Sequence, residues 1–194
     1  MKEKILTESE IQEGAKEFEK IYGSDLLAVE LSYTTSVLCK MAKDAGVKIL
    51  LSGAGAEELF AGYHRHVLHF QEGKDLRKLL DEELASLPQR DIARAESIAK
   101  KSGIKLICPL LGERVISAAR EFPAEKNISI SQGGEITKKI VLRDAAKFLG
   151  VPDLARLRPK KAMQYGSGVH KAFMARREKF PPGTRNPFKG QSKT

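Results

Sequence analysis

The sequence at residues 52–63, Ser-Gly-Ala-Gly-Ala-Glu-Glu-Leu-Phe-Ala-Gly-Tyr, combines glycines with two adjacent carboxylates. Gly53 and Gly55 follow an apolar run, and glycines after a strand let the backbone turn tightly and present N–H groups to an anion. Glu57 and Glu58 then open a predicted helix whose positive dipole end points to the same place. A carboxylate beside a phosphate needs a bridging cation, usually Mg²⁺. Taken alone, the pattern favours a plain strand-to-helix turn whose acids complement the helix dipole, and a magnesium–phosphate site is the alternative.

A second candidate segment covers residues 158–168. It begins with Arg-Pro-Lys-Lys and ends with Gly-Ser-Gly. Arg158, Lys160 and Lys161 place three cations within four residues. Lysine supplies a compact point charge that can stabilise negative charge developing on a phosphate or an acyl phosphate. The segment could therefore clamp a phosphate-rich ligand, and a basic loop followed by a flexible turn is the alternative.

A third pair of cations lies between these segments, on a helix predicted over residues 137–149. Lys139 and Arg143 are four residues apart, so they share one face of that helix. Taken alone, the spacing favours a solvated helix surface, and contact of both cations with a ligand is the alternative.

The apolar spacing predicts a chain that is mostly helical. Thr7 and Glu10 form a capping box that begins a helix, which Gly23 ends. Further helices are expected to end at Ala45 and to cover 58–72, 113–122, 137–149 and 168–179, with two more between 76 and 101. The fold class that follows is α/β, predominantly helical, with only one to three strands.

The predicted strands are few and short. Residues 47–51, Val-Lys-Ile-Leu-Leu, are typical of a buried strand in a parallel sheet, while 25–31 and 104–108 indicate short extended runs. So few strands do not make a stable open sheet, and natural proteins cover an exposed strand edge. We therefore expect a homo-oligomer or hetero-oligomer whose contact lies near Leu50, Leu51 and residues 25–31.

Length and composition set broad limits. The 194 residues suffice for one domain, expected over 1–180, followed by a disordered basic tail at 181–194. Two cysteines, Cys39 and Cys108, are too few for a disulfide scaffold or a structural zinc site, which favours a cytoplasmic location. No apolar run approaches the length of a membrane span, so no membrane association is expected.

The charge distribution is uneven along the chain. Residues 1–100 hold 14 basic and 18 acidic side chains, whereas residues 101–194 hold 20 and 7. The basic half is expected to face an anion, which could be a nucleotide, RNA or an acidic patch on a protein. A solvated basic surface is the alternative.

Taken together, these segments resemble the synthetase domain of glutamine-dependent asparagine synthetases, a branch of the N-type ATP pyrophosphatases. The family pattern Ser-Gly-x-Gly-Ala-Asp-Glu-Leu-Phe-x-Gly-Tyr is matched by residues 52–63 at nearly every position. The other matching motifs are Pro-Leu-Leu-Gly at 109–112, Lys-x-x-Leu-Arg at 139–143, and Arg-x-Lys at 158–160 followed by Gly166 and Gly168. The sequence Ala-Met-Gln-Tyr-Gly-Ser at 162–167 is most similar to that of asparagine-synthetase-domain-containing relatives. The resemblance implies part of an adenine-nucleotide alpha-hydrolase-like (Rossmann-like) domain.

The resemblance also implies an activity and roles for residues. Family members adenylate the side-chain carboxylate of aspartate with Mg-ATP, release pyrophosphate, and let ammonia displace AMP. It implies Glu57 as a Mg²⁺–pyrophosphate ligand and Lys160 as the cation that stabilises the acyl-adenylate transition state, and both are candidate catalytic residues. Nucleotide contacts are expected from Ser52, Gly53, Gly55, Lys139, Arg143 and Arg158, and metal contacts from Glu57 and Glu58.

Several departures from the family pattern qualify these expectations. The sequence has no Ser-Gly-Gly-x-Asp-Ser pyrophosphate loop, and Lys2 stands where the glutaminase domain has its cysteine. Ala54 replaces an acid, and Ile107 and Gly112 replace the Arg and Asp that flank Pro-Phe-Leu. We expect one half of a split ligase whose loop comes from a second polypeptide, or else a degenerate remnant. A non-catalytic subunit that binds RNA or a partner protein is the alternative.

Overall fold

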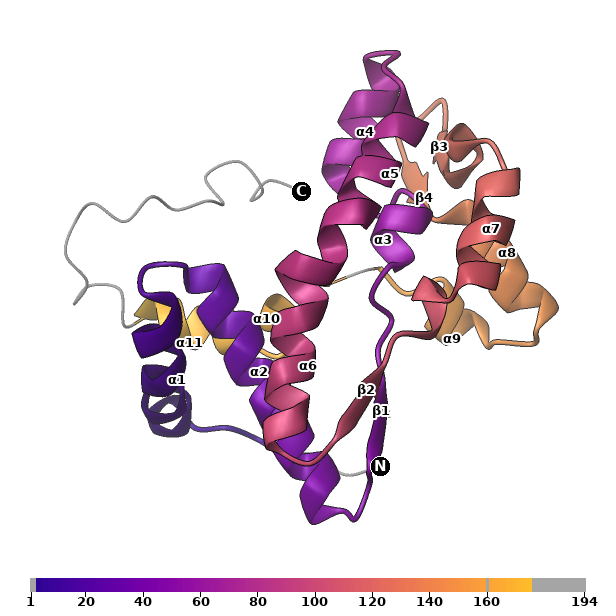
Figure 1. Cartoon of the computed structure of the whole chain (residues 1–194). Helices are drawn as coiled ribbons and strands as arrows, with labels where there is room; N and C mark the ends of the chain where they lie inside the picture. Colours follow the sequence, from indigo (N-terminus) through magenta and orange to yellow (C-terminus); the bar gives the residue numbers. More distant parts are fainter. Residues whose placement is uncertain (1–2, 160, 176–194) are drawn as a thin grey trace. The chain divides into compact units, whose positions relative to one another are not determined.

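A computed structural model describes residues 3–159 and 161–175, which fold mainly into helices with a few short strands (Figure 1). The chain divides into two units, one formed by Met1–Leu38 with Lys161–Thr194 and the other by Cys39–Lys160. None of the described helices is both long and apolar enough to span a membrane. The predicted fold class, α/β and predominantly helical, is confirmed.

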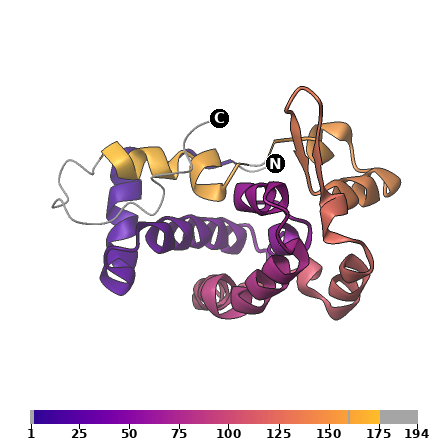
Figure 2. The same cartoon turned by 90° about the horizontal axis from the view of Figure 1, so that it is seen from above.

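The first unit is helical. Its described elements are α1 (Glu8–Tyr22), the first part of α2 (Leu26–Asp44), α10 (Met163–Gly166) and α11 (Val169–Ala175). The predicted capping box is present, with the Thr7 side chain accepting from the Glu10 backbone N–H at 3.2 Å. Helix α11 packs beside α1, as Figure 2 also shows, and the buried Glu30 carboxylate lies 2.8 Å from His170 Nδ1.

The extended run predicted over residues 25–31 is wrong, because this segment begins helix α2. The Asp25 side chain accepts a hydrogen bond from the Ala28 backbone N–H at 3.0 Å and so caps the helix. Ala28, Val29 and Tyr33 are buried at helical rather than alternating spacing. Consequently this segment offers no strand edge to a partner.

The second unit contains all the described strands. Its elements are the end of α2, β1 (Ile49–Leu51), α3 (Ala56–Leu59), α4 (His64–Gln71), α5 (Leu76–Leu87), the π-helix η1 (Pro88–Ile92), α6 (Ala93–Lys101), β2 (Lys105–Ile107), the 3-10 helix η2 (Pro109–Leu111), α7 (Glu113–Glu121), the 3-10 helix η3 (Ala124–Asn127), β3 (Ile128–Ile130), β4 (Ile136–Lys138), α8 (Ile140–Phe148) and α9 (Asp153–Arg156).

Strands β1 and β2 form a two-stranded parallel sheet, as the apolar runs predicted. Leu50 pairs with Leu106, and both pack against buried residues of α2, α6 and the segment before β2: Cys39, Ala42, Ala99 and Ile104. On the strand's other side, Ile49 is 51% and Leu51 71% exposed. One face of the sheet is thus covered by helices of this chain, while the oligomer contact expected near β1 stays a prediction.

Two predicted helices differ from the structure, one by an interruption and the other by a later beginning. The helix expected over 58–72 is divided into α3 and α4, because Ala61 has φ +52° and the Gly62 N–H donates to the Glu57 carbonyl at 3.0 Å. The helix expected over 137–149 begins only at Ile140, since β3 and β4 form an antiparallel hairpin just before it. This hairpin adds two strands that the apolar spacing did not predict.

Candidate functional site

The turn after β1, residues 52–55, has a backbone geometry that requires glycine at one position. The Ser52 N–H donates to the Ile107 carbonyl at 2.8 Å, and the Ser52 hydroxyl accepts from the Ala54 N–H at 3.2 Å. Gly55 has φ +92°, and a Cβ there would lie 2.4 Å from Leu111 Cδ2, so only glycine fits. Gly53 has no such neighbour. Helix α3 has only four residues, so its dipole contributes little to anion binding.

Two predicted site residues from different motifs meet beside this turn. Lys139 Nζ lies 2.9 Å from Glu57 Oε1, and the two side chains are only 17% and 13% exposed. Helix α8 reaches α3 because Val141 and Leu142 pack against the cluster that contains Leu59 and Phe60. Apolar packing therefore places a cation on the motif carboxylate.

The backbone around this ion pair is unusual. In the described part of the chain, Ala61 and Lys139 are the non-glycine residues with positive φ, at +52° and +57°. A Cβ at Gly62 would lie 2.8 Å from Glu57 Cγ and 3.1 Å from Lys139 Cδ. Left-handed backbone at non-glycine residues costs energy and tends to persist at functional sites. One outlier, Lys139, belongs to the Glu57–Lys139 pair, and the other, Ala61, precedes Gly62, which the pair approaches closely, so both single out this location.

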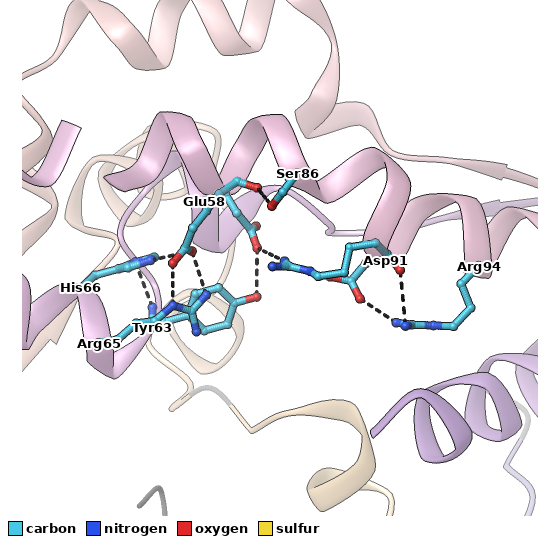
Figure 3. Close-up of polar contacts among 9 residues, drawn as sticks. Glu58, Tyr63, Arg65, His66, Ser86, Asp91 and Arg94 are labelled. Atoms are coloured by element: carbon cyan, nitrogen blue, oxygen red, sulfur yellow. Dashed lines mark hydrogen bonds and ion pairs between the residues drawn. The ribbon is translucent and has the colours of Figure 1, made fainter. Parts of the chain in front are cut away.

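Glu58, the neighbouring carboxylate, points into a different environment (Figure 3). Its side chain is 2% exposed, accepts a hydrogen bond from the Tyr63 hydroxyl at 3.0 Å, and lies 3.8 Å from Arg90 of the π-helix η1. Burial raises the pKa of Tyr63, and the charge of Glu58 raises it further. Arg90 also binds Asp91 at 2.7 Å. Glu58 is thus held by a phenol and a guanidinium inside the unit.

The same network continues to helix α5 through Arg65 and His66. Arg65 donates to both carboxylate oxygens of Glu83 at 2.6 and 2.7 Å, and buried His66 lies 3.0 Å from Glu83. Burial alone would raise the pKa of Glu83, but the hydrogen bonds and charges of His66 and Arg65 lower it to about 2. The Arg65 guanidinium also stacks 3.9 Å above the Tyr63 ring. These contacts hold the beginning of α4, which follows Gly62, against helix α5.

The remaining predicted residues lie apart from this pair or beyond the described chain. The Arg143 guanidinium donates to the carbonyls of Lys138, at 2.8 Å, and of Arg156. Arg158 is exposed after α9, and Lys160 lies outside the described residues. The convergence of Glu57 and Lys160 on one ligand therefore stays a prediction.

Sequence reasoning missed the roles of Gly62, Tyr63 and Arg90. Tyr63 looks like a packing residue in the sequence, yet its hydroxyl binds the buried Glu58. Gly62 matches the family pattern, but only the close approach of Glu57 explains why a side chain does not fit there. Nothing local in the sequence indicates that Arg90, 32 residues beyond Glu58, returns to it.

The geometry limits how a metal could bind. No cluster of three or more His, Cys, Asp or Glu side chains suited to a metal occurs among residues 3–159 and 161–175. Mg²⁺ commonly binds proteins through one or two carboxylates and takes its other ligands from phosphates and water. Glu57, beside the turn at 52–55, fits a magnesium ion that arrives with phosphates, whereas it does not fit one held by protein alone.

Comparison with known proteins shows to which family this chain belongs. The family model described as asparagine synthase matches residues 2–80 and 68–179. The chain belongs to the asparagine synthase family. This membership agrees with the resemblance that residues 52–63 carry.

Similarities to individual proteins agree with this family membership. The chain is 31% identical over 202 residues to the putative asparagine synthetase (glutamine-hydrolyzing) 1 of Methanocaldococcus jannaschii, covering 88% of this chain and 37% of that protein. It is 34% identical over 129 residues to human asparagine synthetase domain-containing protein 1, covering 66% and 20%. A maize asparagine synthetase (glutamine-hydrolyzing) is 26% identical over 138 residues, covering 68% and 23%. The matches thus span between a fifth and just over a third of these relatives.

Proposed function

We propose that this chain is a component of an ATP-dependent, AMP- and pyrophosphate-forming amide ligase that adenylates a carboxylate, aspartate or a related acid. The observation that carries the proposal is the Glu57–Lys139 contact at 2.9 Å, which joins two family motifs 82 residues apart. It lies beside a turn in which Gly55 admits no side chain. A carboxylate, a lysine and backbone N–H groups are the groups that bind magnesium phosphates.

The proposed roles follow the chemistry of acyl transfer. The Ser52–Gly55 turn would form the pocket wall, and Glu57 would hold Mg²⁺, which supplies charge neutralisation for the phosphates. The acceptor carboxylate would attack the α-phosphorus of ATP and pyrophosphate would leave. Ammonia would then attack the acyl carbon and expel AMP. Lys160 would stabilise the negative charge that develops during adenylation.

The phosphate-binding loop of the family pattern, Ser-Gly-Gly-x-Asp-Ser, does not occur in these 194 residues. We propose that a second polypeptide supplies it, as the other half of a split enzyme. Among the described residues β1 pairs with β2 alone, so its other edge can accept added strands, and the exposed face that carries Leu51, 71% exposed, can accept a covering layer.

The test is formation of AMP from α-labelled ATP, with aspartate and related acids as acceptors, in the presence and absence of a loop-bearing polypeptide. We expect turnover only with that polypeptide, and a loss of at least about 100-fold in Glu57→Gln. The matched control is Glu125→Gln, an exposed glutamate of η3. AMP formation by the chain alone would overturn the split arrangement, and full activity of Glu57→Gln would overturn the site.

The second candidate function is a non-catalytic subunit that binds RNA through its basic half. It is favoured by ten basic residues against one acid from Arg158 onward. Binding through phosphates weakens steeply as salt rises, because bound counterions are released. RNA affinity measured by fluorescence anisotropy across a salt series should fall steeply in this case, and a flat response would remove this candidate.

A further inference from the structure

The Glu57–Lys139 ion pair is largely shielded from water, with side chains 13% and 17% exposed. Charges at such a depth lose hydration, which only an opposite charge or good hydrogen bonds restore. Each of the two groups therefore needs an opposite charge or good hydrogen bonds in every state of the site. A magnesium ion that binds Glu57 must compete with the lysine ammonium for the same carboxylate.

We propose that Lys139 is the resting partner of Glu57 and that the pair exchanges partners when a magnesium-bound phosphate arrives. Glu57 passes from the ammonium to the metal, and the ammonium of Lys139 passes to a phosphate oxygen. This inference rests on the proposed function, because it assumes that the site receives magnesium phosphates.

The structure provides a fixed backbone and a long side chain for this exchange. The Lys139 carbonyl accepts from the Arg143 N–H at 2.9 Å, and the preceding carbonyl of Lys138 accepts from the Arg143 guanidinium at 2.8 Å. The left-handed backbone at Lys139 directs the side chain toward Gly62, which leaves room for it. Four methylene groups then let the ammonium move without the main chain.

Two charged groups near the Glu57–Lys139 pair are engaged by other partners. Glu58, on the same helix, is 2% exposed and engaged by Tyr63 and Arg90, so it is not placed to take the released ammonium. The Arg143 guanidinium is engaged by two backbone carbonyls, so it is not placed to take the released carboxylate.

Charge balance makes the two ligands interdependent. A metal ion alone would leave the ammonium beside a dication, and a phosphate alone would meet the Glu57 carboxylate. Together they satisfy both residues. Metal and phosphate should therefore strengthen each other's binding, and this coupling is reciprocal by thermodynamic necessity.

The test uses Mn²⁺ as the metal probe and inorganic pyrophosphate as the phosphate probe, on the purified full chain. Free Mn²⁺ is measured by electron paramagnetic resonance for the native chain, Lys139→Met and Lys139→Gln. Removing the competing ammonium should tighten Mn²⁺ binding about tenfold and weaken pyrophosphate binding in the presence of Mn²⁺ about tenfold. The matched control is Lys147→Met, an exposed lysine of α8, which should change neither affinity more than about twofold.

Opposite shifts in one variant separate exchange from mere support of the fold, because a lysine that only stabilises the site would weaken both ligands when removed. Parallel losses, or an unchanged Mn²⁺ affinity in both lysine variants, would overturn the proposal. The double variant Glu57→Gln/Lys139→Gln should lose the tighter Mn²⁺ binding of Lys139→Gln. If the tighter Mn²⁺ binding persists in the double variant, the proposal is also overturned. None of these measurements needs adenylation, so a chain that shows the exchange but forms no AMP would reject the proposed function alone.

Discussion

Glu57 and Glu58 are consecutive residues of one short helix, yet their carboxylates lie in two different regions of the same unit. Glu57 lies beside the glycine turn and contacts the flexible ammonium of Lys139. Glu58 is buried and bound by the Tyr63 hydroxyl, close to Arg90. The comparison indicates that two adjacent acids of a motif need not share a role. We infer that Glu57 is the metal ligand and that Glu58 holds the helix in place.

The largest effect on stability is expected from Glu58→Ala. It leaves the Tyr63 hydroxyl and the Arg90 guanidinium without this buried carboxylate, which should lower the free energy of unfolding by about 3 kcal/mol. The less deeply buried Glu57→Ala should cost about 1 kcal/mol. Urea denaturation measures both, and equal losses would contradict the distinction between the two acids.

Gly62→Ala should come next, with a loss of about 2 kcal/mol, because overpacking forces Glu57 and Lys139 to shift. Gly53→Ala is the matched control, since a Cβ there meets no atom within 4 Å. The control should change stability by less than about 1 kcal/mol. If thermal unfolding shows the same loss for both variants, the close approach at Gly62 does not constrain the site.

Tyr63→Phe removes only the hydroxyl that donates to Glu58 at 3.0 Å. We expect a loss of about 1 kcal/mol in unfolding free energy, the usual net value of one hydrogen bond. The Glu58→Gln/Tyr63→Phe double-mutant cycle measures the coupling. Strictly additive losses would show that the phenol does not support Glu58.

The last effect is confined to acid and leaves stability near neutral pH unchanged. Glu83 has a pKa of about 2 in the folded chain against an ordinary value of 4.5. The stability from this carboxylate is therefore fully present above about pH 4.5 and is lost as the pH falls toward 2. Urea midpoints measured across this range should decline less steeply in Glu83→Gln than in the native chain. An identical pH dependence would show that His66 and Arg65 do not act through Glu83.

Local features of the fold could be predicted because they depend on neighbouring residues. The Thr7 capping box and the β1 strand with its glycine turn follow from spacing and backbone preference. The apolar run at 25–31 favours an extended segment, yet the Asp25 side chain caps the beginning of helix α2. An Asp three residues before the N–H that it caps is the local signal for this helix beginning.

The partners within the site could not be predicted in the same way. Glu57 and Lys139 are 82 residues apart, and their meeting depends on how α8 packs on α3. The sequence placed Lys139 and Arg143 on one helix face, whereas Lys139 has left-handed backbone just before α8 and Arg143 is bound to carbonyls. Directions of side chains at such a junction follow from tertiary packing, which periodicity does not describe.

A crystal structure of the chain with Mn²⁺ and pyrophosphate examines the site directly, since anomalous scattering locates the metal. We expect the manganese peak on a Glu57 carboxylate oxygen, the ammonium of Lys139 on a pyrophosphate oxygen, and Glu58 still bound to Tyr63. An intact Glu57–Lys139 pair, with metal and pyrophosphate bound elsewhere, would contradict the assignment of this location as the phosphate–metal site.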